Sequence, residues 1–272
     1  MTNSNSSNSP YILEMRNVSK TFPGVKALDQ INLRVKRGSV HALMGENGAG
    51  KSTLMKILYG IYIPDEGGEL ILDDKPFKPG RPIDAIRRGL TMVPQEISPA
   101  ANLTIADNFY LGREITKGKF FLNQKAMNEQ ASAILKELGV PMDVTEKMSD
   151  VSVAKAQLVA IATAVSNDAK VIIMDEPTTA LTENEVDQLY RIIETVKARG
   201  IAIIFISHKL DEVFRVSDEI TVIRDGQYVD TKPTKEVTKE QLISMMVGRD
   251  MSEMFQRERF ELSDEIVLEI KH

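Results

Sequence analysis

The chain has 272 residues, and its 34 Lys and Arg residues against 39 Asp and Glu residues give a formal net charge of −5. At roughly 150 residues per domain this length predicts one or two domains, and an apolar share of 42% with a charged share of 27% is ordinary for a globular protein. The chain has no cysteine, which excludes disulfide frameworks, zinc–thiolate sites and thiol nucleophiles.

Membrane spans, a secretory leader and extensive contact with nucleic acid are not expected. The longest apolar run, residues 201–206, is far shorter than the ~20 residues that a membrane helix needs. Residues 1–10 are rich in Ser and Asn without an apolar centre, so they predict a disordered tail and not a signal peptide. A mildly acidic chain without basic runs argues against nucleic acid as the main partner.

The first part of the chain predicts strands, a glycine loop and a helix. Residues 11–17 and 27–35 alternate apolar and polar side chains, as half-buried strands do. The apolar run 39–44 leads into the glycine-rich residues 45–50, and the apolar positions within residues 51–59 suit a helix that packs on one side. Strand, glycine loop and helix in this order are what a phosphate-binding turn requires.

The middle of the chain is helical in pattern. Residues 124–138 and 153–165 both carry apolar side chains at helical spacing. We expect these helices to form an insert, at about residues 96–167, in a larger α/β domain.

Two uninterrupted apolar runs, residues 171–174 and 201–206, then suit strands that are buried on both faces, as in a parallel sheet. Between them lies an amphipathic helix whose start has the capping-box spacing of Thr182 and Glu185. This alternation predicts an α/β core with right-handed crossovers.

The last residues suggest a second unit. Residues 248–265 are polar and charged and are expected to be a linker. Residues 266–272 (IVLEIKH) then resemble residues 11–17 (YILEMRN) in pattern. This short repeat predicts that the chain ends as a second copy of the domain begins.

The glycine-rich loop fits the motif G-x-x-x-x-G-K-[ST]. Backbone N–H groups at a helix N-terminus form a cradle for phosphates, and glycines let the phosphates approach. Lys51 would reach the β- and γ-phosphates of a nucleotide, and the Ser52 hydroxyl would bind Mg²⁺. The alternative is a glycine turn that matches by chance. The predicted nucleotide-binding residues of this loop are Gly45, Glu46, Asn47, Gly48, Ala49, Gly50, Lys51, Ser52 and Thr53.

Two carboxylates and a histidine end the buried strands. Ligands of open α/β sheets lie beyond the carboxyl ends of the strands, so Asp175 is placed to hold Mg²⁺ and Glu176 to polarise an attacking water. His208 follows the next strand at the same edge, which favours contact with a γ-phosphate over a packing role. By contrast, His41 lies within a predicted strand and is expected to pack in the core.

Three motifs together resemble those of a known protein family. The phosphate loop GENGAGKST, the strand VIIMDEP and the histidine of FISHK occur in the order found in the ATP-binding cassette (ABC) ATPases of membrane transporters, over roughly residues 11–247. The resemblance implies a P-loop NTPase core with a mostly parallel sheet, an antiparallel β subdomain and an inserted α-helical subdomain. It also implies that Gln95 senses the γ-phosphate and metal, and that Phe22, 29 residues before Lys51, stacks on adenine.

The segments NLTIADNFYLGRE, IMDEPTTALTENEV and MMVGRD are further similar to bacterial sugar importers of the ribose and galactose type, in which one polypeptide carries two cassettes. This resemblance implies an ATPase at the cytoplasmic face of the membrane, with ATP and Mg²⁺ as its ligands. Its partners would be a second cassette, paired head to tail, the membrane permease subunits and, indirectly, a sugar-binding protein. Residues 100–112 are candidates for contact with the permease, although Phe109, Tyr110 and Leu111 equally suit the core of the insert.

Two segments depart from the family pattern. Ser152, Val153, Ala154 and Lys155 stand where the family has its Ser-Gly-Gly-Gln signature, and Ser152 lies 23 residues before Asp175, as the family spacing requires. The methyl group of Ala154 occupies a place where backbone must approach the partner's phosphate, so the ATP site completed by this segment is expected to be weaker. Thr182 replaces an Asp found in many cassettes, which puts communication between the two sites in doubt.

Three other functions stay open at this stage. A soluble cassette ATPase that acts on ribosomes or DNA ends is disfavoured by the acidic charge balance. A P-loop kinase would explain the phosphate loop but not Gln95, the segment around Ser152 and His208 together. A nucleotide-binding fragment that is inactive without a second cassette is the third.

Overall fold

The computed structural model describes residues 9–118 and 121–248 of the chain. In chain order these residues form β1 (Tyr11–Phe22), β2 (Val25–Lys36), β3 (Val40–Met44), α1 (Lys51–Leu58), β4 (Glu69–Leu72), β5 (Lys75–Pro76), α2 (Pro82–Arg87), β6 (Leu90–Val93), α3 (Ile105–Tyr110), β7 (Thr116–Lys117), β8 (Phe121–Leu122), α4 (Gln124–Glu137), the 3-10 turn η1 (Met148–Asp150), α5 (Val153–Ser166), β9 (Val171–Asp175), α6 (Glu183–Ala198), β10 (Ala202–Ile206), α7 (Leu210–Val216), β11 (Glu219–Arg224), β12 (Gln227–Pro233), the 3-10 turn η2 (Thr234–Glu236) and α8 (Lys239–Val247).

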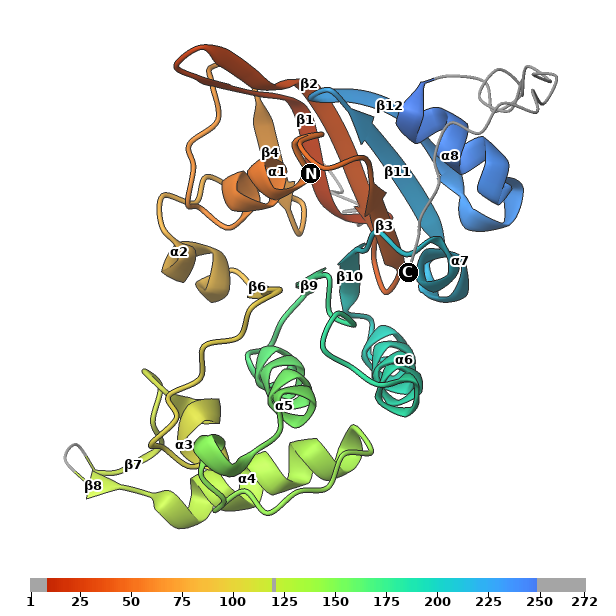
Figure 1. The fold of residues 1–272 in the computed structure, drawn as a ribbon. Helices are drawn as coiled ribbons and strands as arrows, with labels where there is room; N and C mark the ends of the chain where they lie inside the picture. The colour runs from red at the N-terminus through yellow and green to blue at the C-terminus, as the bar shows by residue number, and fades with distance from the viewer. Residues whose placement is uncertain (1–8, 119–120, 249–272) are drawn as a thin grey trace, which may run out of the picture.

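One ten-stranded sheet, in the order β5-β4-β1-β2-β12-β11-β3-β10-β9-β6, forms the centre of the molecule (Figure 1). Its strands β3, β6, β9 and β10 are parallel to one another, and β11 is parallel to β3. The strands β1, β2, β4 and β5 are antiparallel, and the pairing of Gln227 with Asp29 joins this part to the rest. The expected fold class, with a mostly parallel core and an antiparallel β part, is therefore confirmed.

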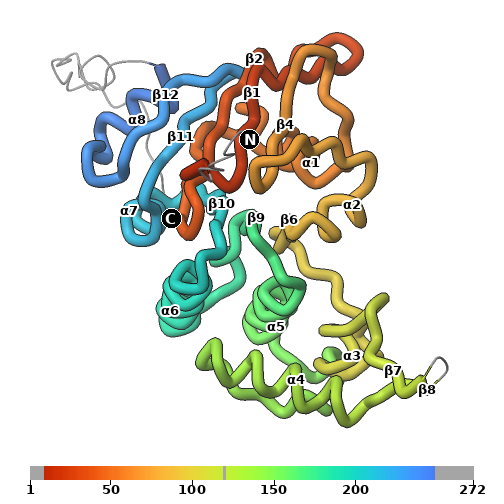
Figure 2. Tube along the Cα trace, turned by 180° about the vertical axis from the view of Figure 1, so that it is seen from behind, coloured from red at the N-terminus to blue at the C-terminus, as the bar shows by residue number. Residues whose placement is uncertain are grey.

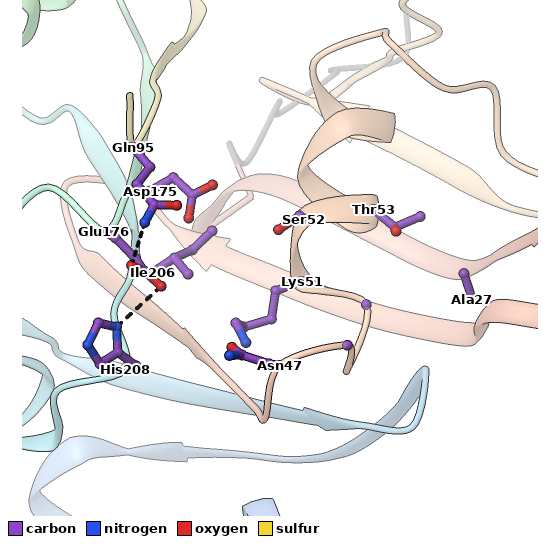
Figure 3. Close-up of a pocket in the computed structure, with 12 residues that line it drawn as sticks. Ala27, Asn47, Lys51, Ser52, Thr53, Gln95, Asp175, Glu176, Ile206 and His208 are labelled. Carbon is purple, nitrogen blue, oxygen red and sulfur yellow. Dashed lines mark hydrogen bonds and ion pairs between the residues drawn. The ribbon is translucent and has the colours of Figure 1, made fainter. Parts of the chain in front are cut away.

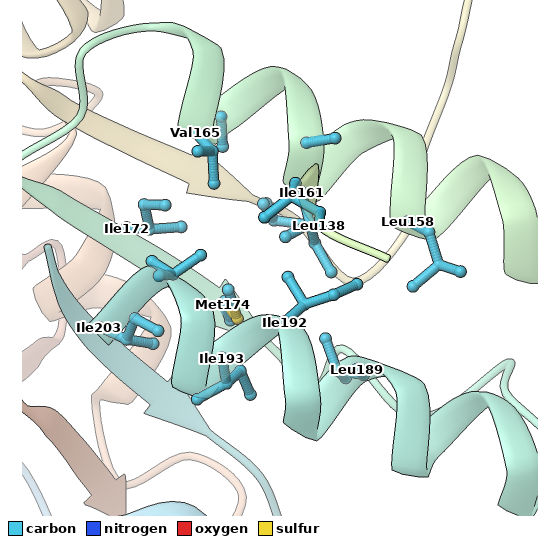
Figure 4. Close-up of a cluster of buried hydrophobic side chains, with 14 of the residues drawn as sticks. Leu138, Leu158, Ile161, Val165, Ile172, Met174, Leu189, Ile192, Ile193 and Ile203 are labelled. Atoms are coloured by element: carbon cyan, nitrogen blue, oxygen red, sulfur yellow. The ribbon is translucent and has the colours of Figure 1, made fainter. Parts of the chain in front are cut away.

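The central strands are buried on both faces. Along β9, Ile172 and Met174 belong to one hydrophobic cluster, whereas Val171 and Ile173 belong to a second cluster across the sheet. The strand β10 alternates in the same way. Because successive side chains of a strand point to opposite faces, an unbroken apolar run is what a strand covered on both sides requires. Figure 4 shows the first of these clusters, between β9, β10 and helices α5 and α6.

The helices α3, α4 and α5 form a part of the molecule that lies away from the antiparallel strands, as Figures 1 and 2 show. Local caps begin these helices: the Thr104 hydroxyl and the Asp107 carboxylate cap α3 reciprocally, and the Ser152 hydroxyl accepts a hydrogen bond at the start of α5. The helical insert expected at about residues 96–167 also contains two short strands that its pattern does not predict. A two-stranded ribbon, β7–β8, lies between α3 and α4, because its strands of two residues are too short to leave a periodic pattern.

The β1–β2 hairpin is longer than its alternating pattern predicts. Both strands have 12 residues, and their pairing has several register shifts. Each such shift inverts the in–out alternation, which is why the pattern in the sequence stops at residue 17. The predicted helices within residues 51–59, 124–138 and 153–165 are each confirmed to within a few residues.

The two alternatives for residues 109–111, contact with a permease or packing in the insert, can be compared with their burial. Within α3, Phe109 and Tyr110 are buried, whereas the adjacent Leu111 is 58% exposed, so the two aromatic rings belong to the core. Residues 1–8 of the predicted tail (1–10), and all but residue 248 of the predicted linker (248–265) and second unit (266–272), lie outside the described residues. Within the described residues, no helix is both long enough and apolar enough to cross a bilayer.

Candidate functional site

The carboxyl ends of β3, β9 and β10 meet at one edge of the sheet. The register pairs Phe205 with Ala42 and Ile206 with Asp175, so the segments that follow these strands start side by side. They surround a cavity of about 590 Å³ (Figure 3). Its lining comprises Ala27, Asn47, Gly48, Gly50, Lys51, Ser52, Thr53, Gln95, Asp175, Glu176, Ile206 and His208.

The glycine loop runs from β3 into α1. Two of its positions, Gly45 and Gly50, must be glycine because backbone atoms of other strands lie too close for a side chain. Gly50 is the left-handed cap of α1, with φ +101°. A Cβ atom at Gly50 would lie 2.8 Å from the carbonyl oxygen of Ala27, and one at Gly45 would lie 2.2 Å from that of Ile223. The close packing of β2 and β11 therefore excludes side chains here, and the first N–H groups of α1 remain free to bind an anion.

Lys51 holds this loop in shape. Its Nζ atom donates hydrogen bonds to the carbonyl oxygens of Gly45 at 2.7 Å and Glu46 at 3.0 Å. Burial lowers the pKa of the Lys51 ammonium, and the carboxylates of Glu176 and Asp175 oppose this effect. An anion with several negative charges in the cavity would therefore relieve an unfavourable positive charge.

Asp175 and Ser52 supply oxygen atoms to the same cavity. Burial raises the pKa of the Asp175 carboxyl, as does the neighbouring Glu176, whereas Lys51 and Lys56 lower it. Within the described residues no cluster of three or more His, Cys, Asp or Glu side chains could hold a metal ion. One carboxylate and one hydroxyl fit Mg²⁺, which keeps most of its water or phosphate ligands when it binds beside a nucleotide.

Glu176 faces the cavity between two partners. Its carboxylate accepts a hydrogen bond from Gln95 Nε2 at 2.9 Å and lies 3.3 Å from His208 Nδ1. Glu176 also has a positive φ of 45°, a backbone strain that is common at functional sites. Its N–H group donates to the carbonyl oxygen of Ile206. The pairing of β9 with β10 therefore continues to Glu176 and fixes its carboxylate beside His208.

Some predicted residues lie elsewhere. Phe22 does not line the cavity; its ring packs edge-on against Tyr62, with centroids 5.2 Å apart, and the Lys20 ammonium lies 5.4 Å from its centre. Gly45, Glu46 and Ala49 shape the loop from outside the cavity lining. Ala27 and Ile206, which do line it, were not predicted, because nothing in the local sequence distinguishes them from other apolar residues of strands.

The segment around Ser152 is separate from the cavity and starts helix α5. Ser152, Val153 and Lys155 are exposed, and the Ser152 hydroxyl accepts from the N–H of Lys155 at 3.3 Å. Ala154 is only 7% exposed, so its methyl group does not project from the surface that a partner would approach. The Ala154 methyl group should therefore hinder the approach of a partner's phosphate less than the sequence predicts.

A phosphate loop that faces a carboxylate pair and a histidine at the edge of a parallel sheet defines a P-loop nucleotide-binding protein. Comparison with known families shows which family of P-loop proteins the chain belongs to. The model of the ABC transporter family matches residues 28–179, more than half of the chain. The chain therefore belongs to the ABC transporter family.

Sequence identity to individual proteins supports the assignment to the ABC transporter family. The chain is 48% identical, over 255 residues, to a putative ribose/galactose/methyl galactoside import ATP-binding protein of Geobacillus kaustophilus, covering 93% of this chain and 50% of that protein. It is also 48% identical to the galactose/methyl galactoside import ATP-binding protein MglA of Yersinia pestis, covering 96% of this chain and 51% of that protein. The chain spans about half the length of the curated relatives it matches.

Solved structures share the fold. An ATP-binding cassette of an ABC transporter in its ADP conformation superposes with a TM-score of 0.76 at 25% identity, covering 91% of this chain and 99% of that one. A nucleotide-free cassette gives the same TM-score at 26% identity, covering 89% of this chain and 96% of that one. The helical part and the antiparallel β part therefore both belong to a known arrangement.

Proposed function

We propose that this chain binds Mg-ATP and hydrolyses it, and that this reaction drives sugar import through a membrane permease. The observation that supports it best is the cavity in which the Lys51 loop faces Glu176, His208 and Gln95. ATP carries the charge that would compensate the half-buried Lys51 ammonium.

Each side chain has a role that its position suggests. The N–H groups at the start of α1 and the Lys51 ammonium bind the β- and γ-phosphates. Glu176 accepts a proton from the water that attacks the γ-phosphate, and the bond to the β-phosphate breaks to release ADP and phosphate. His208 contacts the γ-phosphate, and Gln95 links the attacking water to the metal site. Mg²⁺ bound by Ser52, Asp175 and Gln95 would neutralise phosphate charge.

The importer assignment rests on the relatives, whose names describe ribose or galactose import ATP-binding proteins. We infer that this chain corresponds to the N-terminal cassette of a tandem protein, since it matches half of each relative and the pattern of residues 11–17 recurs at residues 266–272. Its partners would then be a second cassette, permease subunits and, through them, a sugar-binding protein. The expected location is the cytoplasmic face of the membrane, with Phe22 against the adenine base and residues 152–155 completing the partner's site.

The test is Mg-ATP hydrolysis by the 272-residue chain at increasing protein concentration. If two copies pair head to tail, the rate grows faster than linearly with concentration. Glu176→Gln should bind ATP but hydrolyse it at least ~100-fold more slowly, the usual contribution of a general base. Glu129→Gln, which makes the same change on the exposed surface of α4, is the matched control and should behave like the wild type.

A wild-type rate in Glu176→Gln would remove Glu176 as the base. ATP binding without turnover at any concentration would identify the chain as a fragment that needs its second cassette. Absence of ATP binding would refute the proposed function altogether.

A further inference from the structure

A buried carboxylate lies behind the cavity and is not part of its lining. Glu212, in the first turn of α7, is only 7% exposed. The sequence motifs assign no role to it. Burial of a carboxylate is costly unless donors satisfy both oxygens, so the groups that surround Glu212 indicate what it does.

Two hydroxyl groups donate hydrogen bonds to this carboxylate, and a lysine forms an ion pair with it. The Thr178 hydroxyl lies 2.7 Å from Oε1 and 2.9 Å from Oε2, and the Ser207 hydroxyl lies 2.8 Å from Oε2. The Lys209 ammonium, which is partly exposed, lies 3.1 Å from Oε1 and supplies the opposite charge. A carboxylate only accepts hydrogen bonds, and each of these partners can donate one.

Two of the partners are neighbours of the reacting groups. Thr178 lies two residues after Glu176, in the segment that follows β9. Ser207 directly precedes His208, in the segment that follows β10, and its hydroxyl also accepts from the N–H of Lys209 on the other side of His208. Glu212 thus bridges the two segments that carry Glu176 and His208.

We propose that Glu212 is a positioning residue, whose buried carboxylate ties Thr178 to Ser207 and so holds Glu176 and His208 at the spacing that hydrolysis needs. The predicted effect on rate rests on the proposed function, but the bridge itself does not. Phosphate binding by the Lys51 loop lies on the other side of the cavity. Loss of the bridge should therefore lower kcat and leave nucleotide affinity unchanged.

The first test cuts the bridge at Thr178. Thr178→Val keeps the shape of the side chain but removes the hydroxyl, whereas Thr178→Ser keeps the hydroxyl. We expect kcat for Mg-ATP to fall about tenfold in Thr178→Val and in Glu212→Gln, the size of effect that small misplacements of reacting groups cause. Thr178→Ser should stay within about twofold of the wild type. The Kd for Mg-ATP should not change in any of them.

The matched control is Asp211→Asn. Asp211 is the preceding residue of α7, has an 85% exposed side chain and pairs with Lys239. The substitution Asp211→Asn removes a carboxylate from the same helix turn and leaves the hydrogen bonds between Glu212, Thr178 and Ser207 in place. If Asp211→Asn or Thr178→Ser lowers kcat as much as Thr178→Val, the hydroxyl bridge is not what positions the site.

A second readout does not depend on hydrolysis. The ring Cε1–H resonance of His208 in the nucleotide-free chain can be assigned from its absence in His208→Gln. We expect it to shift in Thr178→Val and Glu212→Gln and to stay in place in Thr178→Ser and Asp211→Asn. If the wild type hydrolyses no ATP, the proposed activity of the chain fails while this resonance still tests the bridge. An unmoved resonance in Thr178→Val overturns the inference.

Discussion

Single residues of this chain show how burial and charge act on histidine. His41 is fully buried in β3, and its Nε2 atom lies 2.7 Å from the Thr221 hydroxyl. Burial lowers the pKa of His41 from 6.5 to about 4, and the Lys36 ammonium adds to this effect. The carboxylate of Glu219, with Oε2 3.9 Å from Nδ1, does not offset the burial. The histidine in the core is therefore neutral near pH 7.

This pKa predicts an acid sensitivity of the fold. The unfolded chain binds a proton at His41 below about pH 6.5, whereas the folded chain does so only near pH 4, so stability is lost as pH falls between these values. In His41→Gln the midpoint of thermal unfolding should fall less over that interval than in the wild type. Thr221→Val keeps the buried imidazole and should keep the wild-type slope. Equal slopes in His41→Gln and the wild type would contradict the prediction.

At the scale of elements, the turn between β11 and β12 supports the phosphate loop. Asp225 and Gly226 both have positive φ, as in the tight turn of a two-residue hairpin. The Gly226 N–H donates to the carbonyl oxygen of Ala49, and its carbonyl oxygen accepts from the N–H of Asp29. A Cβ atom at Gly226 would lie 2.7 Å from the carbonyl oxygen of Ala27.

The substitution Gly226→Ala should therefore push the turn away from the loop and weaken Mg-ATP binding by about tenfold, a loss of roughly 1.4 kcal/mol. Gly200→Ala is the control. Gly200 has a similar φ of +79° and no other atoms within 4 Å of an added Cβ, so it introduces the backbone strain alone. Nucleotide titrations and thermal unfolding of both variants separate the two effects. Equal loss of affinity in both would show that strain, and not contact with the loop, is responsible.

At the scale of the whole molecule, the cavity and the segment around Ser152 are separate sites. The cavity lies at the edge of the sheet, whereas Ser152 begins a helix of the α3–α5 part and does not line it. Under the proposed head-to-tail pairing, a complete site takes its loop from one copy and its signature from the other. Two different defects in two chains should then complement each other.

Mixing Lys51→Ala with Ser152→Arg tests this arrangement. Each variant alone should have little ATPase activity, because every site contains a defect. In a mixed pair, one site combines the intact loop of the Ser152 variant with the intact signature of the Lys51 variant, so the rate should recover to a measurable part of the wild-type value. A mixture no more active than the sum of its components would argue against shared sites.

The local motifs were the most predictable part of the protein. The loop around Lys51, the carboxylates Asp175 and Glu176, and His208 each carry their chemistry in a short pattern next to a buried strand, and the structure brings them to one cavity. Phe22 was less predictable, since an aromatic residue in a hairpin has no local feature that separates stacking on a base from packing on Tyr62.

Contacts between distant segments could not be predicted from the sequence. The bridge from Glu212 to Thr178 joins residues 34 positions apart, and the hydrogen bond from Gly226 to Ala49 joins residues 177 positions apart. Hydrophobic periodicity records which face of a strand or helix is buried, but it does not record which other segment covers that face.

The α/β class, the phosphate loop and the residue types at the strand ends can be predicted from the sequence alone, because these depend on local periodicity and on chemistry within a few residues. The three-dimensional fold was needed to show which of these side chains share a cavity, that Ala154 is buried, and that Glu212 and Gly226 contact the segments that form the site. These properties depend on the strand order and the pairing register, which bring segments together across long stretches of chain.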